Sequence, residues 1–354
     1  MGRKGLKFRH QVIDPAPPGS HHDITLLADI NGDGRNEIII GGKHGPPNLF
    51  WYENPSWKRH AMADAPDLEA GGALIDINRD GRPDIVAGQQ WGGRELYWFE
   101  NPPDPRQRWP RHVIENRFNK YHDQAVGDID CDGEPELIIL SQKAGVLVYY
   151  DIPEDPYQEP WPRTCCHLIA QFTDDRIEGL RVADVDGNGR PAVVAGPTIY
   201  RMSTRRRWQV ESFAPDFIMT RAAVAHLTGH KEMDIVLCEG ESHPGRLAVF
   251  SPPDRRPQVL RDDLFHPHSL EVADFDGDGR PDIFVAEMGL GRHFNPRMFI
   301  YRNLGDGRFE EHLIQTGVPT HEAKVADLTG DGRPDIVGKG YDPERHVDVW
   351  FNET

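Results

Sequence analysis

Short apolar runs alternate with polar boxes along the whole chain. One run, such as residues 270–274, leads into a box rich in Asp and Gly, and a second run, such as residues 282–286, follows the box. A third run is aromatic, as in LFWYENP and LYWFENPP, and a fourth contains histidine, as in WPRHVI over residues 109–114. Because β-branched and aromatic residues fill these runs, the pattern predicts four short β-strands per unit and no long helix.

The whole unit recurs seven times. Its boxes begin 42 to 56 residues apart, at Asp29, Asp76, Asp128, Asp184, His226, Asp274 and Asp327. A period near fifty residues has room for the four strands of a propeller blade. The last unit lacks its fourth strand, and the matching run, FRHQVI, lies at residues 8–13. We therefore predict an all-β, seven-bladed β-propeller, a single domain over residues 1–354, whose N-terminal strand completes the last blade.

The charge and hydropathy of the chain disfavour some classes of binding partner. The chain has 40 Lys and Arg against 57 Asp and Glu, a formal net charge of −17, which disfavours nucleic acids and anionic lipid surfaces. No apolar run approaches the roughly 18 residues of a membrane span, and the N-terminal residues lack the apolar segment of a secretory signal. We expect a cytoplasmic protein, or a secreted or periplasmic one if the chain has been trimmed.

The boxes follow the pattern D-x-[DN]-x-D-G-x-x-[DE], with oxygen-bearing side chains at positions 1, 3, 5 and 9. Hard oxygen ligands on a tight loop suit Ca²⁺, whereas the apolar residue at position 12 and the flanking strands exclude an EF-hand. The alternative is an Asx-turn held by internal hydrogen bonds. The box that ends in Ala192 and the box at His226 are incomplete. Five boxes keep the full set and predict about five structural Ca²⁺ sites: Asp29, Asn31, Asp33, Glu37; Asp76, Asn78, Asp80, Asp84; Asp128, Asp130, Asp132, Glu136; Asp274, Asp276, Asp278, Asp282; Asp327, Thr329, Asp331, Asp335.

These boxes resemble the FG-GAP or VCBS repeats, and the resemblance covers nearly the whole chain. It implies a calcium-loop propeller, as in α-integrin heads, propeller polysaccharide lyases and aldos-2-ulose dehydratase. The Phe-Gly element of that family is missing here, and residues 195–197, Ala-Gly-Pro, are the nearest match to its Gly-Ala-Pro. The resemblance implies fold and calcium, but the same scaffold serves adhesion, lectin and lyase roles.

Histidines fall into classes by their place in the repeat. Those of the closing strands recur at one blade position, which predicts an architectural role: His10, His60, His112, His167 and His312. Another set lies six residues before the boxes, where His122, His268 and His321 occur. Equivalent positions in a ring lie at equal radius, so these three should converge at the mouth of the central channel. Nearby positions add charges for the channel, among them Arg181, Arg221 and Lys324.

A concave pocket lined by groups that titrate near neutrality is a candidate active site. Loops after the second strands reach the same face and add aromatic and charged residues, including Tyr341. We predict a carbon–oxygen lyase, of the polysaccharide lyase or sugar dehydratase type, that acts on a carbohydrate such as a uronic acid or keto-sugar. In this hypothesis the histidines act as base or metal ligands and Tyr341 as acid. Anion stabilisation would come from Arg181, Arg221 and Lys324.

Two further hypotheses stay open. The histidines, together with Glu178, Glu271 or Glu322, would hold Zn²⁺ or Mn²⁺ as a Lewis acid, which is compatible with a lyase. Alternatively, the propeller is a non-catalytic module that binds glycans or proteins. The uneven residues six positions before the boxes favour one asymmetric site over a pocket repeated between blades.

Overall fold

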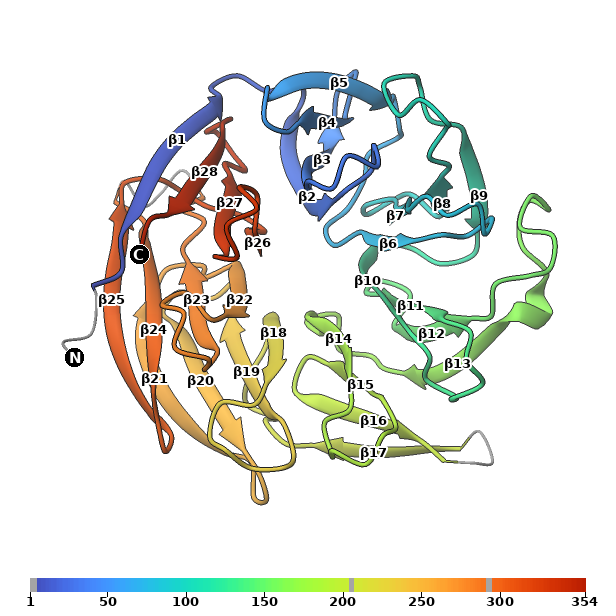
Figure 1. Ribbon diagram of the computed structural model, residues 1–354. Coiled ribbons are helices and arrows are strands. Elements are labelled where there is room, and N and C mark those ends of the chain that lie inside the picture. Colours follow the sequence, from blue (N-terminus) through green and yellow to red (C-terminus); the bar gives the residue numbers. More distant parts are fainter. Residues whose placement is uncertain (1–4, 204–206, 291–294) are drawn as a thin grey trace.

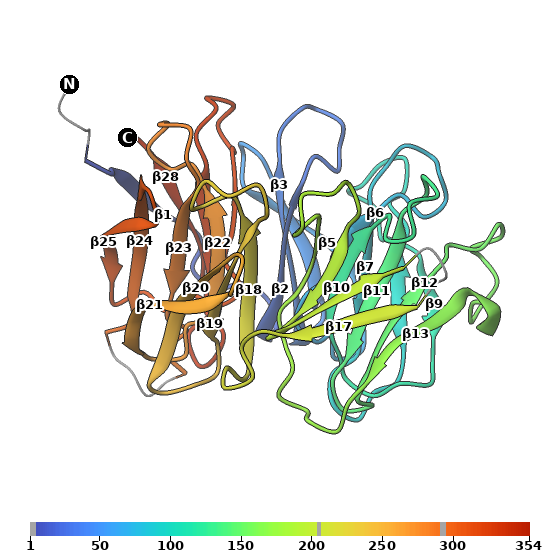
Figure 2. The ribbon, with the colours of Figure 1, turned by 90° about the horizontal axis from the view of Figure 1, so that it is seen from below.

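Seven antiparallel sheets of four strands each form a ring around a central channel in the computed structural model (Figure 1). The structure describes residues 5–203, 207–290 and 295–354. Each sheet is one blade, and the first strand of each blade lies nearest the channel. Seen from the side, the blades stand between two faces of the ring that carry the connecting loops (Figure 2). The predicted all-β seven-bladed propeller is confirmed.

The strands follow one another through the blades in chain order. Blades 1 to 4 comprise β2 (Ser20–Ala28), β3 (Glu37–His44), β4 (Leu49–Glu53), β5 (Lys58–Ala63); β6 (Ala73–Ile75), β7 (Asp84–Gly88), β8 (Leu96–Phe99), β9 (Arg111–Glu115); β10 (Tyr121–Gly127), β11 (Glu136–Ser141), β12 (Val146–Tyr150), β13 (Cys166–Gln171); β14 (Leu180–Ala183), β15 (Ala192–Ala195), β16 (Thr198–Met202), β17 (Trp208–Ser212). Blades 5 to 7 comprise β18 (Thr220–Ala225), β19 (Asp234–Glu239), β20 (Gly245–Ser251), β21 (Arg256–Leu264); β22 (Ser269–Ala273), β23 (Asp282–Ala286), β24 (Arg297–Gly305), β25 (Arg308–Thr316); β26 (Lys324–Ala326), β27 (Asp335–Lys339), β28 (Val347–Asn352), β1 (Phe8–Asp14). Within the described residues the only helix is the short 3-10 helix η1 (Arg163–Cys165), and no helix there is long and apolar enough to cross a membrane.

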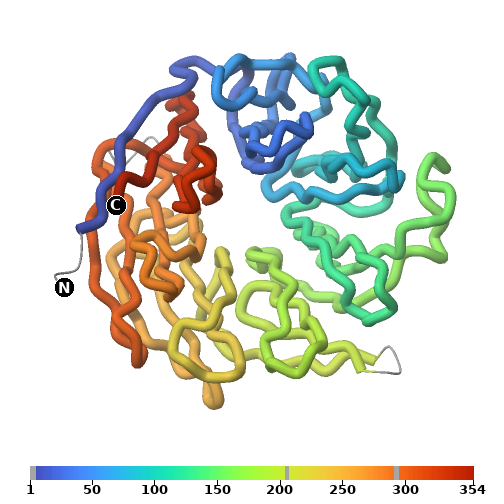
Figure 3. Tube along the Cα trace, viewed as in Figure 1, coloured from blue at the N-terminus to red at the C-terminus, as the bar shows by residue number. Residues whose placement is uncertain are grey.

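The two ends of the chain meet in blade 7. Strand β1 pairs antiparallel with β28, with Phe8 opposite Asn352 and His10 opposite Trp350. The trace in Figure 3 shows the blue N-terminal segment lying along the outside of the red C-terminal strands. The predicted closure is therefore confirmed, and β1 covers the edge of β28 that would otherwise be unpaired.

The hydrophobic core lies between neighbouring blades. One buried cluster joins blades 1 and 2 through residues such as Trp51 and Tyr97, and similar clusters join the other neighbouring blades around the ring. Trp51, Trp98 and Trp350 are almost fully buried in these clusters. Because burial of one large apolar side chain contributes about 1.5–3 kcal/mol, the clusters hold the ring together and leave the channel for polar residues.

The closing-strand histidines pack against the third strands. The imidazole of His60 stacks on Trp51 with ring centroids 4.6 Å apart, and its Nε2 lies 2.9 Å from Glu53. The same arrangement holds for His10 on Trp350, His112 on Trp98 and His167 on Tyr149. The predicted architectural role fits these four contacts, whereas His312 lies opposite Ile300 and pairs with Glu310 at 3.0 Å.

Each box forms the loop between the first and second strands of its blade. In blade 1 the carboxylate of Asp29 accepts hydrogen bonds from the backbone N–H groups of Gly32 and Gly34, and Glu37 accepts one from Ile30. Gly34 has a φ of +85°, a conformation that disfavours any side chain. Because the first strand runs from the channel mouth to the box, the boxes lie at the opposite face of the ring from the histidines.

Candidate active site at the channel mouth

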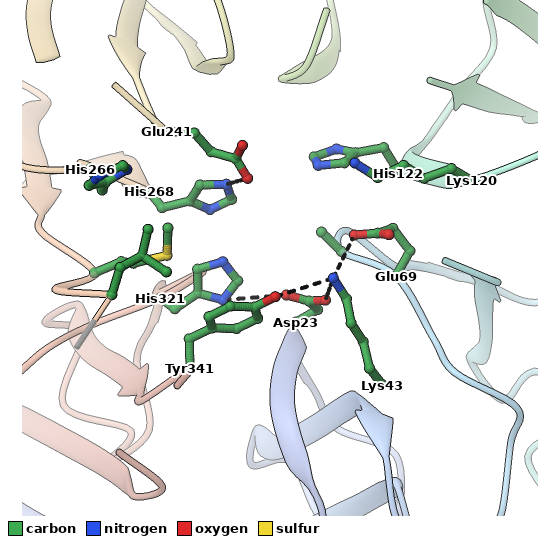
Figure 4. A pocket seen from close by; sticks show the side chains of 13 residues that line it. Asp23, Lys43, Glu69, Lys120, His122, Glu241, His266, His268, His321 and Tyr341 are labelled. Carbon is green, nitrogen blue, oxygen red and sulfur yellow. Dashed lines mark hydrogen bonds and ion pairs between the residues drawn. The ribbon is translucent and has the colours of Figure 1, made fainter. Parts of the chain in front are cut away.

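The chain brings His122, His268, His321 and Tyr341 together around one cavity of about 210 Å³. His122 lies in β10, His268 directly precedes β22, His321 lies in the loop just before β26, and Tyr341 follows β27. Figure 4 shows their side chains pointing toward a common space, which acidic and lysine side chains complete. The full lining is Asp23, Lys43, Glu69, Ala70, Lys120, His122, Glu241, His266, His268, Met288, Leu290, His321 and Tyr341.

Three aromatic rings form a stack along one wall of the cavity. The rings of His268 and His321 lie 4.4 Å apart at 27°, and Tyr341 packs against His321 at 4.6 Å. The Nδ1 of His321 lies 3.1 Å from the backbone carbonyl oxygen of His22, so Nδ1 carries the proton and Nε2 keeps the lone pair. Burial, together with His268 and Lys339, holds the pKa of His321 well below its ordinary value, which keeps this imidazole neutral.

An ionic network adjoins this stack. The Lys43 ammonium lies 3.0 Å from Asp23, 3.4 Å from Glu69 and 3.2 Å from the hydroxyl of Tyr341, to which it donates. Burial raises the pKa of Asp23 to about 6, although Lys43 opposes this shift. Burial also raises the pKa of Tyr341 above its ordinary value, so that its phenol stays protonated at neutral pH.

His122 sits between two carboxylates. Its Nδ1 lies 2.9 Å from Asp123, and its Nε2 lies 3.7 Å from Glu178. Burial lowers the pKa of His122, but Glu178 and Asp123 outweigh that effect and raise the pKa to about 9. Burial raises the pKa of Glu178, whose Oε1 accepts a hydrogen bond of 2.8 Å from Gln142. The other oxygen of Glu178 is buried without a hydrogen-bond partner among the described residues.

The channel below the cavity is closed by buried charges. Arg221 of blade 5 reaches Asp123 of blade 3 at 3.2 Å and Glu322 of blade 7 at 2.8 Å, so one guanidinium links three blades that are not neighbours. This group of three, the charged plug, is almost fully buried.

The three predicted anion-stabilising cations are not among the residues that line the cavity. Arg221 belongs to the charged plug, and its charge is matched by two carboxylates. Lys324 lies 2.6 Å from Glu271, and Arg181 lies 3.7 Å from the same carboxylate. Both side chains stand two positions further along their strands than the residues of the plug, away from the mouth. The cations that do line the cavity are Lys43 and Lys120.

Part of the lining was not among the predicted site residues. Lys120 and His266 both stand eight positions before a box, and Lys43 and Met288 both stand fourteen positions after one, as does the predicted Tyr341. Comparing these two positions across the repeats would have found them. A β-bulge between Tyr121 and Asp123 breaks the strand alternation at this end, so strict alternation does not tell which side chains face the channel.

The donor sets of the boxes differ between blades. In blade 3, oxygens of all four carboxylates lie within 4.8 Å of one another, and burial together with the neighbouring acids raises the pKa of Glu136 to about 7. In blades 2, 6 and 7 an arginine at position 7 pairs with the aspartate at position 5, as Arg82 does with Asp80. Blade 3 has Glu134 at position 7 instead, so its four carboxylates, Asp128, Asp130, Asp132 and Glu136, fit a calcium ion best.

Comparisons with known proteins support the repeat and the fold. Residues 29–87, 76–139 and 274–338 match the model of the FG-GAP-like repeat. No curated protein sequence matches the chain significantly.

Three solved structures resemble this fold. An Agrocybe aegerita lectin, described as recognising non-reducing terminal N-acetylglucosamine, is 19% identical with a TM-score of 0.53 and covers 92% of this chain and 86% of its own. BBS1N, crystallised with ARL6DN, is 10% identical with a TM-score of 0.57. The match covers 98% of this chain and 96% of the BBS1N chain. An ancestral GH74 enzyme is 11% identical with a TM-score of 0.63 and covers 95% of this chain but 51% of its own. At these identities the likeness shows the fold alone.

Proposed function

The chain is an FG-GAP repeat propeller, and from that premise we propose that its channel-mouth cavity binds a carboxylate- or keto-bearing sugar and cleaves it by β-elimination. The observation that carries this proposal is the pairing of His321 with Tyr341 on one wall. His321 offers a lone pair on Nε2, because its Nδ1 faces the His22 carbonyl oxygen. Tyr341, whose ring packs on His321 at 4.6 Å, offers a hydroxyl proton. A base and an acid side by side are what an elimination requires.

Each atom of the reaction then has a partner. Nε2 of His321 takes the proton from the carbon next to the carboxylate or carbonyl group. The electron pair of that C–H bond forms a carbon–carbon double bond, and the C–O bond on the next carbon breaks. The hydroxyl of Tyr341 protonates the departing oxygen. Lys43, 3.2 Å from that hydroxyl, stabilises the phenolate that results.

Lys43 and Lys120 line the cavity and take the anion-stabilising role in this proposal. Two ammonium groups near the substrate carboxylate or carbonyl group stabilise the enolate that forms when the proton leaves. Lys43 is already paired with Asp23 and Glu69, so the ligand must compete with two carboxylates for it. This competition favours ligands with a full negative charge over neutral sugars.

The test is turnover of uronic-acid oligosaccharides and keto-sugars, followed by the ultraviolet absorbance of the new conjugated double bond. We expect His321→Gln and Tyr341→Phe to lower kcat by about 10²–10⁴-fold, because each removes one proton transfer. His312→Gln and Tyr157→Phe are matched controls, since both residues lie outside the cavity lining, and they should keep full activity. Absence of turnover with every substrate class, or unchanged kcat in both cavity variants, would contradict the proposal.

A second candidate function is non-catalytic glycan binding, and an exposed tryptophan favours it. Trp91 is 67% exposed on the loop after β7, with the Lys143 ammonium 4.2 Å from its ring centroid. The neighbouring Gly92 donates to Asn119, which precedes the cavity residue Lys120. An exposed indole beside a pocket offers a flat surface on which a sugar ring stacks.

The two functions make different predictions for Trp91→Ala. A binding module loses about tenfold in glycan affinity with this variant, by isothermal titration calorimetry, and is indifferent to Tyr341→Phe. In the lyase, Trp91→Ala raises KM, whereas Tyr341→Phe lowers kcat with KM little changed. Glycan binding without turnover, insensitive to the His321 and Tyr341 variants, would establish the binding module.

We also propose that the complete boxes hold structural Ca²⁺. The support is their donor chemistry, which is clearest in blade 3, where four carboxylates crowd one loop. The hydrogen bonds from backbone N–H groups to Asp29 also fit a plain Asx-turn, so the two alternatives are separated by measurement. Calcium that raises the melting temperature, with chelator reversing the rise, supports bound ions.

A further inference from the structure

We infer that Glu178, Glu241 and His268 form a binding site for one transition-metal ion, Zn²⁺ or Mn²⁺, on the wall of the cavity. The three side chains come from blades 4, 5 and 6, so the site exists only when these three neighbouring blades are packed together. The inference deepens the proposed function, because the ion would sit beside the ligand. Metal binding itself is measurable without any sugar.

The distances among the donor atoms suit one ion. His268 Nε2 lies 4.0 Å from Glu178 Oε2 and 3.9 Å from Glu241 Oε1. One donor atom from each of the three residues lies within 4.8 Å of the other two. Ligand atoms held about 2.0–2.2 Å from one Zn²⁺ are roughly 3.3–3.6 Å apart, so the two distances from His268 must shorten by roughly half an ångström on binding.

The buried oxygen of Glu178 is the independent sign of a missing cation. The residue is only 1% exposed, and Oε2 has no hydrogen-bond partner among the described residues. A buried carboxylate oxygen without a partner is costly, and a metal ion would offset that cost. Its Oε1 accepts a hydrogen bond from Gln142 and lies 3.7 Å from His122, and these contacts orient the carboxylate toward the other two ligands.

A neighbouring triad, His268 with His321 and Glu322, is a poorer candidate. The two imidazoles are stacked at 27°, so their lone pairs, which lie in the ring planes, do not converge on one point. The Nδ1 of His321 faces the His22 carbonyl oxygen, and Glu322 lies 2.8 Å from Arg221. Both groups therefore already have strong partners.

The inferred site has room for a substrate oxygen. Glu241 is 41% exposed at its side chain, and both Glu241 and His268 line the cavity of about 210 Å³. Three protein ligands with an open position are typical of catalytic zinc sites. In that position the ion would act as a Lewis acid on the carboxylate or carbonyl oxygen of the substrate and assist the two lysines.

The test measures Zn²⁺ binding by the full chain after stripping with chelator, with excess Ca²⁺ present to occupy the boxes. Equilibrium dialysis with elemental analysis should find one Zn²⁺ per wild-type chain. Glu241→Gln, at a partly exposed position that tolerates substitution, should weaken binding at least a hundredfold, as should Glu178→Gln. Glu69→Gln is the matched control, because Glu69 lines the same cavity and has an unpartnered buried oxygen but lies outside the ligand set. Its Zn²⁺ affinity should equal that of the wild type.

Visible absorption of Co²⁺-loaded protein supplies a second readout, and the Glu241→Gln variant should lose that spectrum. The inference is overturned if the wild type binds no more Zn²⁺ than Glu241→Gln, or if Glu69→Gln loses as much as Glu241→Gln. If Zn²⁺ binds as expected but no sugar is cleaved, the elimination fails and the metal site stands. If sugar is cleaved by protein that binds no Zn²⁺, the metal site fails and the elimination stands.

Discussion

The two ends of the channel use the same repeat in opposite ways. At the box end, nearly every blade has the same residues in the same conformation, with Asp29 in blade 1 and Asp274 in blade 6 accepting hydrogen bonds from equivalent backbone N–H groups. At the mouth, the position six residues before the box is different in most blades: Asp23, Ala70, His122, Glu178, Thr220, His268 and His321. Residues that are the same in nearly every blade stabilise the blade fold, which occurs seven times. Residues that differ between blades form a single site at the mouth.

The contrast extends to what holds the blades together. Asparagines at the ends of third strands tie one blade to the box of the preceding blade, as Asn101 does by donating to the Ile30 carbonyl oxygen at 3.0 Å. Asn54, Asn303 and Asn352 make equivalent bonds. The charged plug does the reverse, because it links non-neighbouring blades through one unrepeated arginine. The plug therefore supports the floor of the cavity and does not contribute to the contacts that recur between neighbouring blades.

The largest expected effect comes from breaking the plug with Arg221→Met. The change leaves Asp123 and Glu322 buried without their cation, and removal of one partner from a buried ion pair costs about 3–5 kcal/mol. The free energy of unfolding by urea measures this loss. Arg256→Met is the matched control, since Arg256 is 88% exposed and should change stability by less than about 0.5 kcal/mol. If both variants unfold alike, the plug does not hold the mouth together.

The sequence predicted the fold well because the fold is the part that repeats. The boxes and the histidine-bearing closing strands recur at a defined period, and the last unit lacks its fourth strand. The structure has seven four-stranded blades, and β1 supplies the strand that the last unit lacks. The convergence of His122, His268 and His321 on one cavity followed from the same period.

The rest of the site follows from geometry that the period does not encode. Arg221 occupies a channel position, but whether it faces a ligand or two buried carboxylates depends on side chains from blades 3 and 7. Lys43 belongs to a loop position where other blades have Gln, Thr, Gly, Met or Tyr, so the repeat places it near the mouth but does not show which groups it contacts. Its importance appears only once Asp23, Glu69 and Tyr341 surround it.

A smaller effect separates one box from another. We expect Asp132→Asn in blade 3 to remove most of one site's calcium-dependent stabilisation, about 2.7 kcal/mol at a hundredfold excess of Ca²⁺ over Kd. Asp80→Asn in blade 2 should remove less, because Asp80 already pairs with Arg82 and calcium must displace that guanidinium. Unfolding with and without Ca²⁺ gives the increment for each variant. Equal losses would show that the boxes bind alike, and no calcium increment in the wild type would favour the Asx-turn.

The smallest expected effect is a pH dependence from Lys339, a buried cation at the mouth where the other blades have no charge. Its Nζ donates to the His321 carbonyl oxygen at 2.9 Å. Burial lowers its pKa from 10.5 to about 7, with Glu322 and Asp23 opposing the shift. Between pH 7 and the pKa of the unfolded chain, the unfolded state binds more protons than the folded state, so this group makes stability rise with pH.

Lys339→Met removes that rise. Between pH 7 and pH 9, the unfolding free energy of the wild type should increase relative to that of the variant, by up to about 1.4 kcal/mol per pH unit. Asp23 has a pKa of about 6, so it is ionised across this window in the wild type and contributes little to the difference. Below pH 7 the ammonium is charged in both states, its burial is most costly, and the variant should have its greatest relative advantage. Parallel pH profiles for the two proteins would show that Lys339 keeps its proton in the folded ring.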